Sequence, residues 1–422
     1  MERHLGAFEH FFWLYDQVQP VHFSLCAHLR GHFSIAQLRQ SLVRLQQKHP
    51  LLRVRIEPDE MGRPRFVEQA VPLPLRIATR HDEQQWQREV ETELSQSFDW
   101  ATAPLARVVL LQTATGTETH SELIVTCHHA IADGMSVAYL MRDIVQGLGS
   151  EPEQVRALSD APTLEQLTVP MAPVDSPEPF SSKQPAYNST VSTRPRPHFR
   201  TTWLPARLTQ QLRDRSRAEH TSVHGVVSAA FLLSLARQRG DQASSLKCLS
   251  PINVRSHLSP SVSEALGLYI AYGLTHHDLS LGESIWDMAR SLKAQLSEAA
   301  KPSQWMTDLS GRQTVAATCP DPHTVGQGMQ QQYGFDLLVT NLGQLNLAQP
   351  SGPVGIESLY GPAVMTGLTQ ERVVGVATWG DRLSLSVLVP AADDSDWSAA
   401  ALLTEAVEGL QWAVQVPSLS AA

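Results

Sequence analysis

The sequence predicts a mixed α/β protein in two parts, each with a mixed sheet flanked by helices. Runs with strand-like and helix-like patterns alternate through residues 1–150, and the same alternation returns over residues 201–422. Between them, residues 151–200 are rich in proline, serine and threonine, which favours an irregular linker or crossover. The length of 422 residues is sufficient for two ordinary domains.

The first part opens with a strand-like run at residues 21–29. A helix is expected to follow to about residue 48, because Ser34 is a suitable N-cap. Its apolar side chains share one face: Ile35, Leu38, Leu42 and Leu45. The other predicted strands cover residues 51–56, 105–112 and 123–129, and the other predicted helices cover residues 83–96 and 135–145.

The second part begins near Thr201. Its most distinctive segment is residues 222–237, a nearly all-apolar pattern that indicates a buried helix. The other predicted helices cover residues 208–219, 284–298 and 398–412, and the predicted strands cover residues 247–254, 335–340, 373–378 and 383–389. No internal repeat is visible along the chain.

Composition and charge exclude several function classes. The formal net charge is −9, whereas nucleic-acid binding needs a basic surface. The first residues show no secretory signal pattern, and the longest apolar stretch, residues 225–236, is too short to span a bilayer. We therefore expect a cytoplasmic protein with no transmembrane segment and no nucleic-acid partner.

The cysteines point to neither disulfide nor metal chemistry. Cys26, Cys127, Cys248 and Cys319 lie far apart and form no CxxC pair. They are typical of reduced, buried thiols. Cys127 directly precedes the histidine pair described next, but its apolar neighbours favour a buried thiol over a nucleophile.

The segment His128-His129-Ala130-Ile131-Ala132-Asp133-Gly134 has the pattern HHxxxDG. An apolar strand-like run leads into it, and a helix-like run follows. A neutral histidine held at a strand end can accept a proton from an alcohol or amine that attacks a carbonyl. Because adjacent strand residues point to opposite faces, His128 and His129 are expected to have different roles.

Asp133 and Gly134 complete this pattern. The Asp133 carboxylate could orient a histidine, bind a metal, or hold the loop through a buried ion pair. Gly134 lets the backbone approach a substrate or a neighbouring element closely. A catalytic zinc site is the less favoured alternative, because His129 and Asp133 have no evident third ligand. We therefore expect no metal.

Other motifs are absent or incomplete. The second histidine pair, His276-His277, is followed by Asp278 but has no downstream Asp-Gly, which favours a structural role. The sequence contains no HExxH, no GxSxG, no GxxxxGK[ST] and no GxGxxG. These absences argue against a zinc protease, a serine hydrolase of the elbow type and a nucleotide-binding fold.

Several segments, together with HHxxxDG, resemble the condensation-domain-like acyltransferases. They are Arg3-x-Leu5 with Glu9, His49-Pro50-Leu51-Leu52-Arg53, Phe98-Asp99, Pro104-Leu105-Ala106-Arg107, residues 221–237, Ser250-Pro251-Ile252-Asn253-Val254-Arg255 and Thr340-Asn341-Leu342-Gly343. The likeness is nearest in kind to the stand-alone polyketide-associated and phthiocerol dimycocerosyl transferase-like group. The DFGWG element of the plant branch is absent.

This resemblance implies two chloramphenicol-acetyltransferase-like lobes in a V, with a central channel and His129 near its middle. It also implies that Asp133 points away from substrate and pairs with Arg255, and that Asn341 lies beside the channel. A simple turn role for Asn341, before Gly343, is the alternative.

The implied reaction moves an acyl group from a thioester to an alcohol or amine, with His129 as general base. The thioester would be acyl-CoA or a phosphopantetheinyl acyl carrier protein, a co-substrate rather than a bound cofactor. Two alternatives stay open: a thioester hydrolase and a non-catalytic, condensation-like binding module.

Arginines crowd into residues 194–217 of an otherwise acidic chain. Arg213 and Arg217 are four residues apart, so a helix places them on one face. A solvated face partly neutralised by Asp214 and Glu219 is one interpretation. The other is a docking site for an acidic carrier protein or for the phosphates of coenzyme A, because arginine binds phosphate through paired hydrogen bonds.

Overall fold

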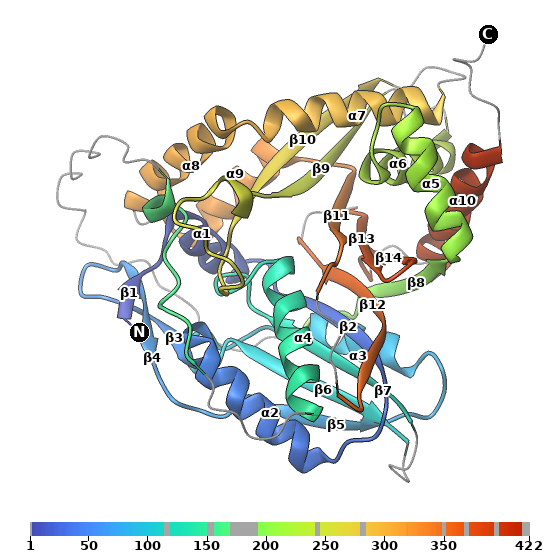
Figure 1. Ribbon diagram of the computed structural model, residues 1–422. Coiled ribbons are helices and arrows are strands. Elements are labelled where there is room, and N and C mark those ends of the chain that lie inside the picture. The colour runs from blue at the N-terminus through green and yellow to red at the C-terminus, as the bar shows by residue number, and fades with distance from the viewer. Residues whose placement is uncertain are drawn as a thin grey trace.

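A computed structural model gives the arrangement of the chain (Figure 1). The structure describes residues 2–113, 119–149, 156–168, 193–240, 245–278, 284–318, 320–347, 352–366, 371–391 and 396–415. These residues form mixed α/β layers, as the sequence predicts: a five-stranded, a six-stranded and a three-stranded sheet, with helices packed against them.

The first lobe is built on the five-stranded sheet, in the order β12-β2-β7-β6-β5. Its strands are β2 (Phe23–Arg30), β5 (Leu75–Thr79), β6 (Ala106–Gln112), β7 (His120–Cys127) and β12 (Gly355–Val364). Neighbours run antiparallel except for β5 and β6. The helices of this lobe are α2 (Ile35–Lys48), α3 (Gln85–Ser95) and α4 (Gly134–Gly149).

A smaller antiparallel sheet, β1-β4-β3, lies beside the first lobe. It consists of β1 (Glu2–His4), β3 (Val54–Pro58) and β4 (Pro64–Glu68). The short helix η1 (Pro50–Arg53) leads into β3. Proline at the first position of η1 has no N–H to leave unpaired, which suits a helix start.

The second lobe is built on the six-stranded sheet, in the order β10-β9-β11-β13-β14-β8. Its strands are β8 (His198–Leu204), β9 (Ser245–Asn253), β10 (Ile270–Asp278), β11 (Leu337–Gln344), β13 (Val373–Trp379) and β14 (Arg382–Val389). The helices packed around it are α5 (Ala206–Ala218), α6 (Val223–Arg239), α7 (Ile285–Ala299) and α10 (Asp396–Gln415).

Three further helices lie together near the second lobe in Figure 1. They are α1 (Ala7–Asp16), α8 (Pro302–Ala317) and α9 (Pro322–Tyr333). Helix α1 contacts both α8 and α9. Thus an N-terminal helix packs against helices about 300 residues later in the chain.

Strand β12 joins the two parts of the sequence. It pairs antiparallel with β2, with Tyr360 opposite Cys26 and Ala363 opposite Ser24. Residues 355–364 therefore complete the sheet of the first lobe, although a division of the sequence at residues 150 and 200 assigns them to the second. The main hydrophobic core continues accordingly from β2 and β7 into β12, β9 and β10.

Most predicted elements are present, and serine N-caps explain the sharpest boundaries. Ser34 accepts a hydrogen bond from Gln37 N at 3.1 Å, and Ser222 and Ser284 cap α6 and α7 in the same way. On α2, Leu38, Leu42 and Leu45 are buried, whereas Ile35 is exposed, contrary to the predicted face.

Three predictions need correction. The segment 51–56 is not one strand, since η1 occupies residues 50–53. Strand β7 ends at Cys127, so the histidines lie in the turn after it and not on the strand. Strand β8 begins at His198, inside the predicted linker. Much of that linker, residues 150–155 and 169–192, lies outside the described residues.

The sequence patterns missed several elements, for identifiable reasons. Helix α1 is buried on almost every side, so it has no polar face to mark its period. Strand β12 contains glycine and proline, which normally disfavour strands. The other unpredicted elements are β1, β4, β5, β8, β10, α8 and α9.

Candidate active site

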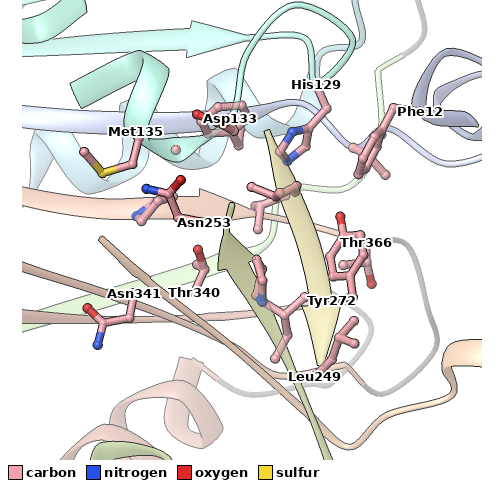
Figure 2. A pocket seen from close by; sticks show the side chains of 18 of the residues that line it. Phe12, His129, Asp133, Met135, Leu249, Asn253, Tyr272, Thr340, Asn341 and Thr366 are labelled. Atoms are coloured by element: carbon pink, nitrogen blue, oxygen red, sulfur yellow. The ribbon is translucent and has the colours of Figure 1, made fainter. Parts of the chain in front are cut away.

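A cleft of about 840 Å³, including its open mouth, lies where the two lobes meet. We call it the central cleft. Its walls come from α1, β2 and the HHxxxDG turn on one side and from β9, β10 and β11 on the other. Figure 2 shows His129 pointing into this space beside Phe12, with Asn341 on the opposite side.

His129 is clamped in position by two aromatic rings and one hydrogen bond. Its imidazole stacks on Phe12 and Phe23, with ring centroids 4.6 and 4.4 Å away. Its Nδ1 lies 3.1 Å from the carbonyl oxygen of Ala132. Because a carbonyl oxygen only accepts, Nδ1 carries the proton and Nε2 keeps its lone pair. The ring therefore presents a base to the central cleft.

The surroundings of His129 keep this base neutral. Burial between the phenylalanine rings lowers the pKa of His129 to about 4, and the hydrogen bond to Ala132 only partly opposes this effect. At neutral pH almost every molecule therefore holds the unprotonated imidazole. No prior deprotonation step is needed before His129 accepts a proton.

His128 has a different environment, although not through strand alternation, since both histidines lie beyond β7. Its side chain is fully buried, and its Nδ1 accepts a hydrogen bond from Ala130 N at 3.0 Å. Its Nε2 lies 3.4 Å from Asp16 Oδ2. Burial alone would raise the pKa of Asp16, but the His128 ring and other donors hold it below its usual value. His128 thus ties the turn to the end of α1.

Asp133 lies at the start of α4, with its carboxylate fully engaged. Oδ1 accepts hydrogen bonds from Ser136 N at 2.8 Å and from Ser136 Oγ at 2.9 Å. Oδ2 accepts from Tyr269 N at 3.0 Å and pairs with Arg255 at 2.5 Å. Of the roles that the sequence leaves open for Asp133, this geometry matches the buried ion pair, combined with capping of α4.

Arg255 brings the second lobe into this network. It lies just after β9, and its guanidinium contacts Asp133, Ser136 Oγ and the carbonyl oxygen of Ala265. The same guanidinium lies over the ring of Tyr269, at 4.8 Å. The side chains of Asp133 and Arg255 are 1% and 8% exposed, so the ion pair between the lobes is shielded from solvent.

Gly134 and Asn341 meet across the base of the cleft. A Cβ on Gly134 would stand 2.8 Å from Leu342 Cδ2, so only glycine allows this approach without a shift of Leu342. The Oδ1 of Asn341 accepts a hydrogen bond from Gly343 N at 2.7 Å, as in a turn. Asn341 also lines the central cleft. Both interpretations of Asn341 therefore describe part of its environment.

Arg213 and Arg217 lie on α5, next to a second hollow of about 670 Å³. We call it the arginine groove. Arg213 donates a hydrogen bond to Gln344, and Arg217 lies 3.3 Å from Asp214 with 76% of its side chain exposed. Asn341 lines both this groove and the central cleft.

The remaining candidates lie apart from this chemistry. His277 is buried in β10, with Nε2 2.9 Å from Thr275 Oγ1, and neither His276 nor His277 lines the central cleft. Burial raises the pKa of the Cys127 thiol to about 12, as suits an inert thiol. Cys319 lies outside the described residues. Within the described ranges, no three His, Cys, Asp or Glu side chains are grouped to hold a metal ion.

Some residues of the site have no signal in the sequence. Phe12 and Phe23 enclose His129 but come from α1 and β2, far from the motif along the chain. Ser136 could have been found, because it follows Asp133 at the spacing of an N-cap and its partner. Asn253, which accepts from Arg255 N at 3.0 Å, lies in a recognised segment but has no predicted role.

Two sequence-family models match this chain. The condensation domain model matches residues 13–155, and the model of the phthiocerol/phthiodiolone dimycocerosyl transferase C-terminus matches residues 193–388. Together they cover both lobes, including the HHxxxDG turn and Arg255. The chain belongs to the condensation-domain-like acyltransferase superfamily.

One curated relative is a linear gramicidin synthase of Brevibacillus parabrevis. It is 26% identical over 170 residues, which make up 38% of this chain but only 3% of that much longer protein. The alignment therefore relates one part of this chain to a small part of a large synthase.

Solved structures share the whole fold at low sequence identity. Polyketide synthase associated protein 5 from Mycobacterium tuberculosis has a TM-score of 0.67 and 18% identity, with 99% of this chain and 98% of that chain covered. The first condensation domain of the CDA synthetase gives 0.70 and 16%, covering 99% and 97%.

Trichothecene 15-O-acetyltransferase from Fusarium sporotrichioides gives a TM-score of 0.70 and 12% identity, covering 98% and 95%. These similarities establish the two-lobed fold. The family assignment supports acyl transfer in general terms.

No helix in the described residues is both long and apolar enough to cross a membrane.

Proposed function

We propose that this protein transfers an acyl group from a thioester to an alcohol or amine, forming an ester or an amide. The observation that carries the proposal is the state of His129. Its tautomer is fixed by Ala132, its pKa is lowered to about 4, and its ring lies on the central cleft between the two lobes. A neutral, oriented base inside a cleft is what proton transfer to or from a bound nucleophile requires.

In this mechanism, Nε2 of His129 accepts the proton of the alcohol or amine as its oxygen or nitrogen attacks the thioester carbonyl. The resulting tetrahedral oxyanion collapses, the C–S bond breaks, and the imidazolium returns the proton to the thiolate. The donor is already activated, so no acyl-enzyme is required. Holding both substrates in one cleft supplies much of the remaining acceleration.

The donor is proposed to be acyl-CoA or an acyl carrier protein, both of which present a phosphopantetheine arm. Two features of the arginine groove support entry from that side. Arg217 is exposed and available to phosphate, and Asn341 connects the groove to the central cleft. The acceptor would then enter from the opposite mouth of the cleft.

The test is thiol release from a panel of acyl-CoA donors, with and without alcohols and amines. Acyl transfer predicts thiol release that depends on the acceptor, with ester or amide detected by mass spectrometry. Equal release without any acceptor would indicate a thioester hydrolase. Binding of acyl-CoA without release would indicate a binding module.

The His129→Ala variant should lower kcat by about 10² to 10⁴ while the protein stays folded, because the general base is removed. The matched control is His276→Ala, which alters an exposed histidine in the second histidine pair and should leave kcat unchanged. Full activity of His129→Ala at saturating acceptor would contradict the mechanism.

A further inference from the structure

A second large hollow lies behind α1, between α1, α8 and α9. We call it the α1–α8–α9 groove. Its volume is about 1,230 Å³, including its open mouth, which is larger than the central cleft. The proposed chemistry at His129 does not use it. Figure 1 shows the three helices grouped together beside the lobe interface.

Helix α1 separates the two hollows. Phe12 and Tyr15 face the central cleft, where Phe12 stacks on His129. Phe11 and Leu14 line the α1–α8–α9 groove. This division explains why α1 has no polar face: both of its sides border apolar surface.

The two hollows meet at Met329 of α9, which lines both. Methionine is unbranched and flexible, so its side chain can move aside at small cost. A chain attached to a carbonyl or hydroxyl near His129 could therefore pass Met329 and continue behind α1. Among the residues that the structure describes, no other lines both hollows.

The walls of the groove favour an apolar occupant. Side chains from α1, α8 and α9 contribute Phe11, Leu14, Val315 and Val325. The charges present are compensated within the groove, since Arg312 bonds to Asp308 at 3.0 Å and lies over Phe11 at 4.6 Å. Burial lowers the pKa of His10 to about 4, so this histidine adds no charge at neutral pH.

We propose that the α1–α8–α9 groove binds the aliphatic chain of a substrate whose reactive group lies at His129. The inference rests on the proposed function and narrows it to a donor or acceptor with a long hydrocarbon chain. Each buried methylene strengthens binding by about fourfold. A chain that reaches past Met329 would therefore be strongly preferred over a short one that stays in the central cleft.

The chain offers substitutions that fill the groove. Gly311 on α8 and Gly328 on α9 both line it, and a Cβ at either position would meet no atom within 4 Å. Leucine at both positions would occupy the groove without touching the central cleft. Leucine also favours helix more than glycine does, so α8 and α9 should stay folded. The matched control is Gly409→Leu, on α10, where a Cβ also has open space.

The first experiment measures binding without turnover, in the His129→Ala background. Calorimetry compares acetyl-CoA with dodecanoyl-CoA, and ethanol with dodecan-1-ol. If the donor chain occupies the groove, Gly311→Leu/Gly328→Leu should weaken dodecanoyl-CoA binding about tenfold or more and leave acetyl-CoA unchanged. If the acceptor chain occupies it, the same loss should appear with dodecan-1-ol. Gly409→Leu should change neither.

The second experiment measures kcat/KM for the same chain lengths with His129 intact. The double variant should lose the preference for long chains while its rates with acetyl-CoA and ethanol match those of the unsubstituted protein. Equal binding and equal kcat/KM for long chains in both proteins would overturn the inference. Failure of the proposed function is distinct, because it would remove transfer with every donor while the binding comparison still reads the groove.

Discussion

At the scale of single residues, the site depends on neighbours that control one imidazole. Phe12 and Phe23 exclude water from the faces of His129, and Ala132 fixes its tautomer. The same apolar contacts that lower the pKa also make the imidazolium costly. The proton is therefore expected to stay on His129 only briefly, until the departing thiolate takes it back.

This environment predicts an unusual pH profile. Because the pKa of His129 is about 4, the base stays neutral as pH falls through 6.5, where an ordinary histidine would become protonated. We expect kcat/KM to be flat between pH 5.5 and 8 on its acidic limb. Steady-state kinetics with a non-ionising alcohol acceptor would measure this. A twofold drop centred near pH 6.5 would show that His129 is not so perturbed.

The ion pair between Asp133 and Arg255 predicts a stability defect. Removal of one partner of a buried pair costs about 3 to 5 kcal/mol, because the other charge stays buried without compensation. Asp133→Ala should therefore lower the melting temperature together with activity. Asp133→Asn, which keeps an acceptor oxygen for Ser136 and Tyr269, should lose less. Unchanged melting with abolished activity would instead assign Asp133 a direct chemical role.

Sequence and structure agree on these residues to different degrees. HHxxxDG identifies His129 because its partners are adjacent along the chain. Arg255 was linked to Asp133 only through the family resemblance, since 122 residues separate them. Phe12 had no signal at all, because its role exists only once α1 packs against the motif turn.

At the scale of elements, local capping decided what could be predicted. Helices α2, α6 and α7 follow serines that accept backbone hydrogen bonds, so their starts are written locally. Helix α1 and strand β12 instead owe their stability to tertiary partners on both sides. Single-sequence patterns do not register such partners, and these two elements were missed.

Helix α5 carries a prediction about the donor. Reversal of charge at Arg217, as in Arg217→Glu, should raise the KM for the acyl-CoA or carrier donor, because phosphate would meet a carboxylate at the arginine groove. The increase should be larger at low salt, where exposed charges are less screened. The acceptor KM should not change.

The control for Arg217→Glu is Arg39→Glu, an equal charge change at an exposed position on α2. This variant corrects for any general effect of net charge on an anionic donor. An unchanged donor KM in Arg217→Glu at low ionic strength would leave only the interpretation that α5 presents a solvated face.

At the scale of the whole molecule, the two lobes are interlocked. Strand β12 completes the sheet of the first lobe, Arg255 reaches back to Asp133, and α1 packs against α8 and α9. The central cleft exists only because these connections hold β9, β10 and β11 opposite the HHxxxDG turn. The composition and motifs of the sequence predicted two lobes, but the exchange of β12 depends on pairing between residues more than 300 positions apart.

The buried histidines predict how the whole protein responds to acid. Burial lowers the pKa values of several of them to about 3 or 4: His10, His22, His28, His129, His224 and His277. In the unfolded chain the same groups take up protons near pH 6.5. The unfolded state therefore binds more protons than the folded state between pH 6.5 and 4, and the free energy of unfolding must fall as the pH falls through this window.

Each such histidine contributes a slope of up to about 1.4 kcal/mol per pH unit, so their sum makes the protein steeply acid-labile. Urea denaturation at pH 7, 6 and 5 would measure this slope. His10→Leu should flatten it, because one buried titrating group is removed, while His32→Gln, at an exposed position, should leave it unchanged. A free energy of unfolding that stays constant from pH 7 to pH 5 would contradict the lowered pKa values, including that of His129.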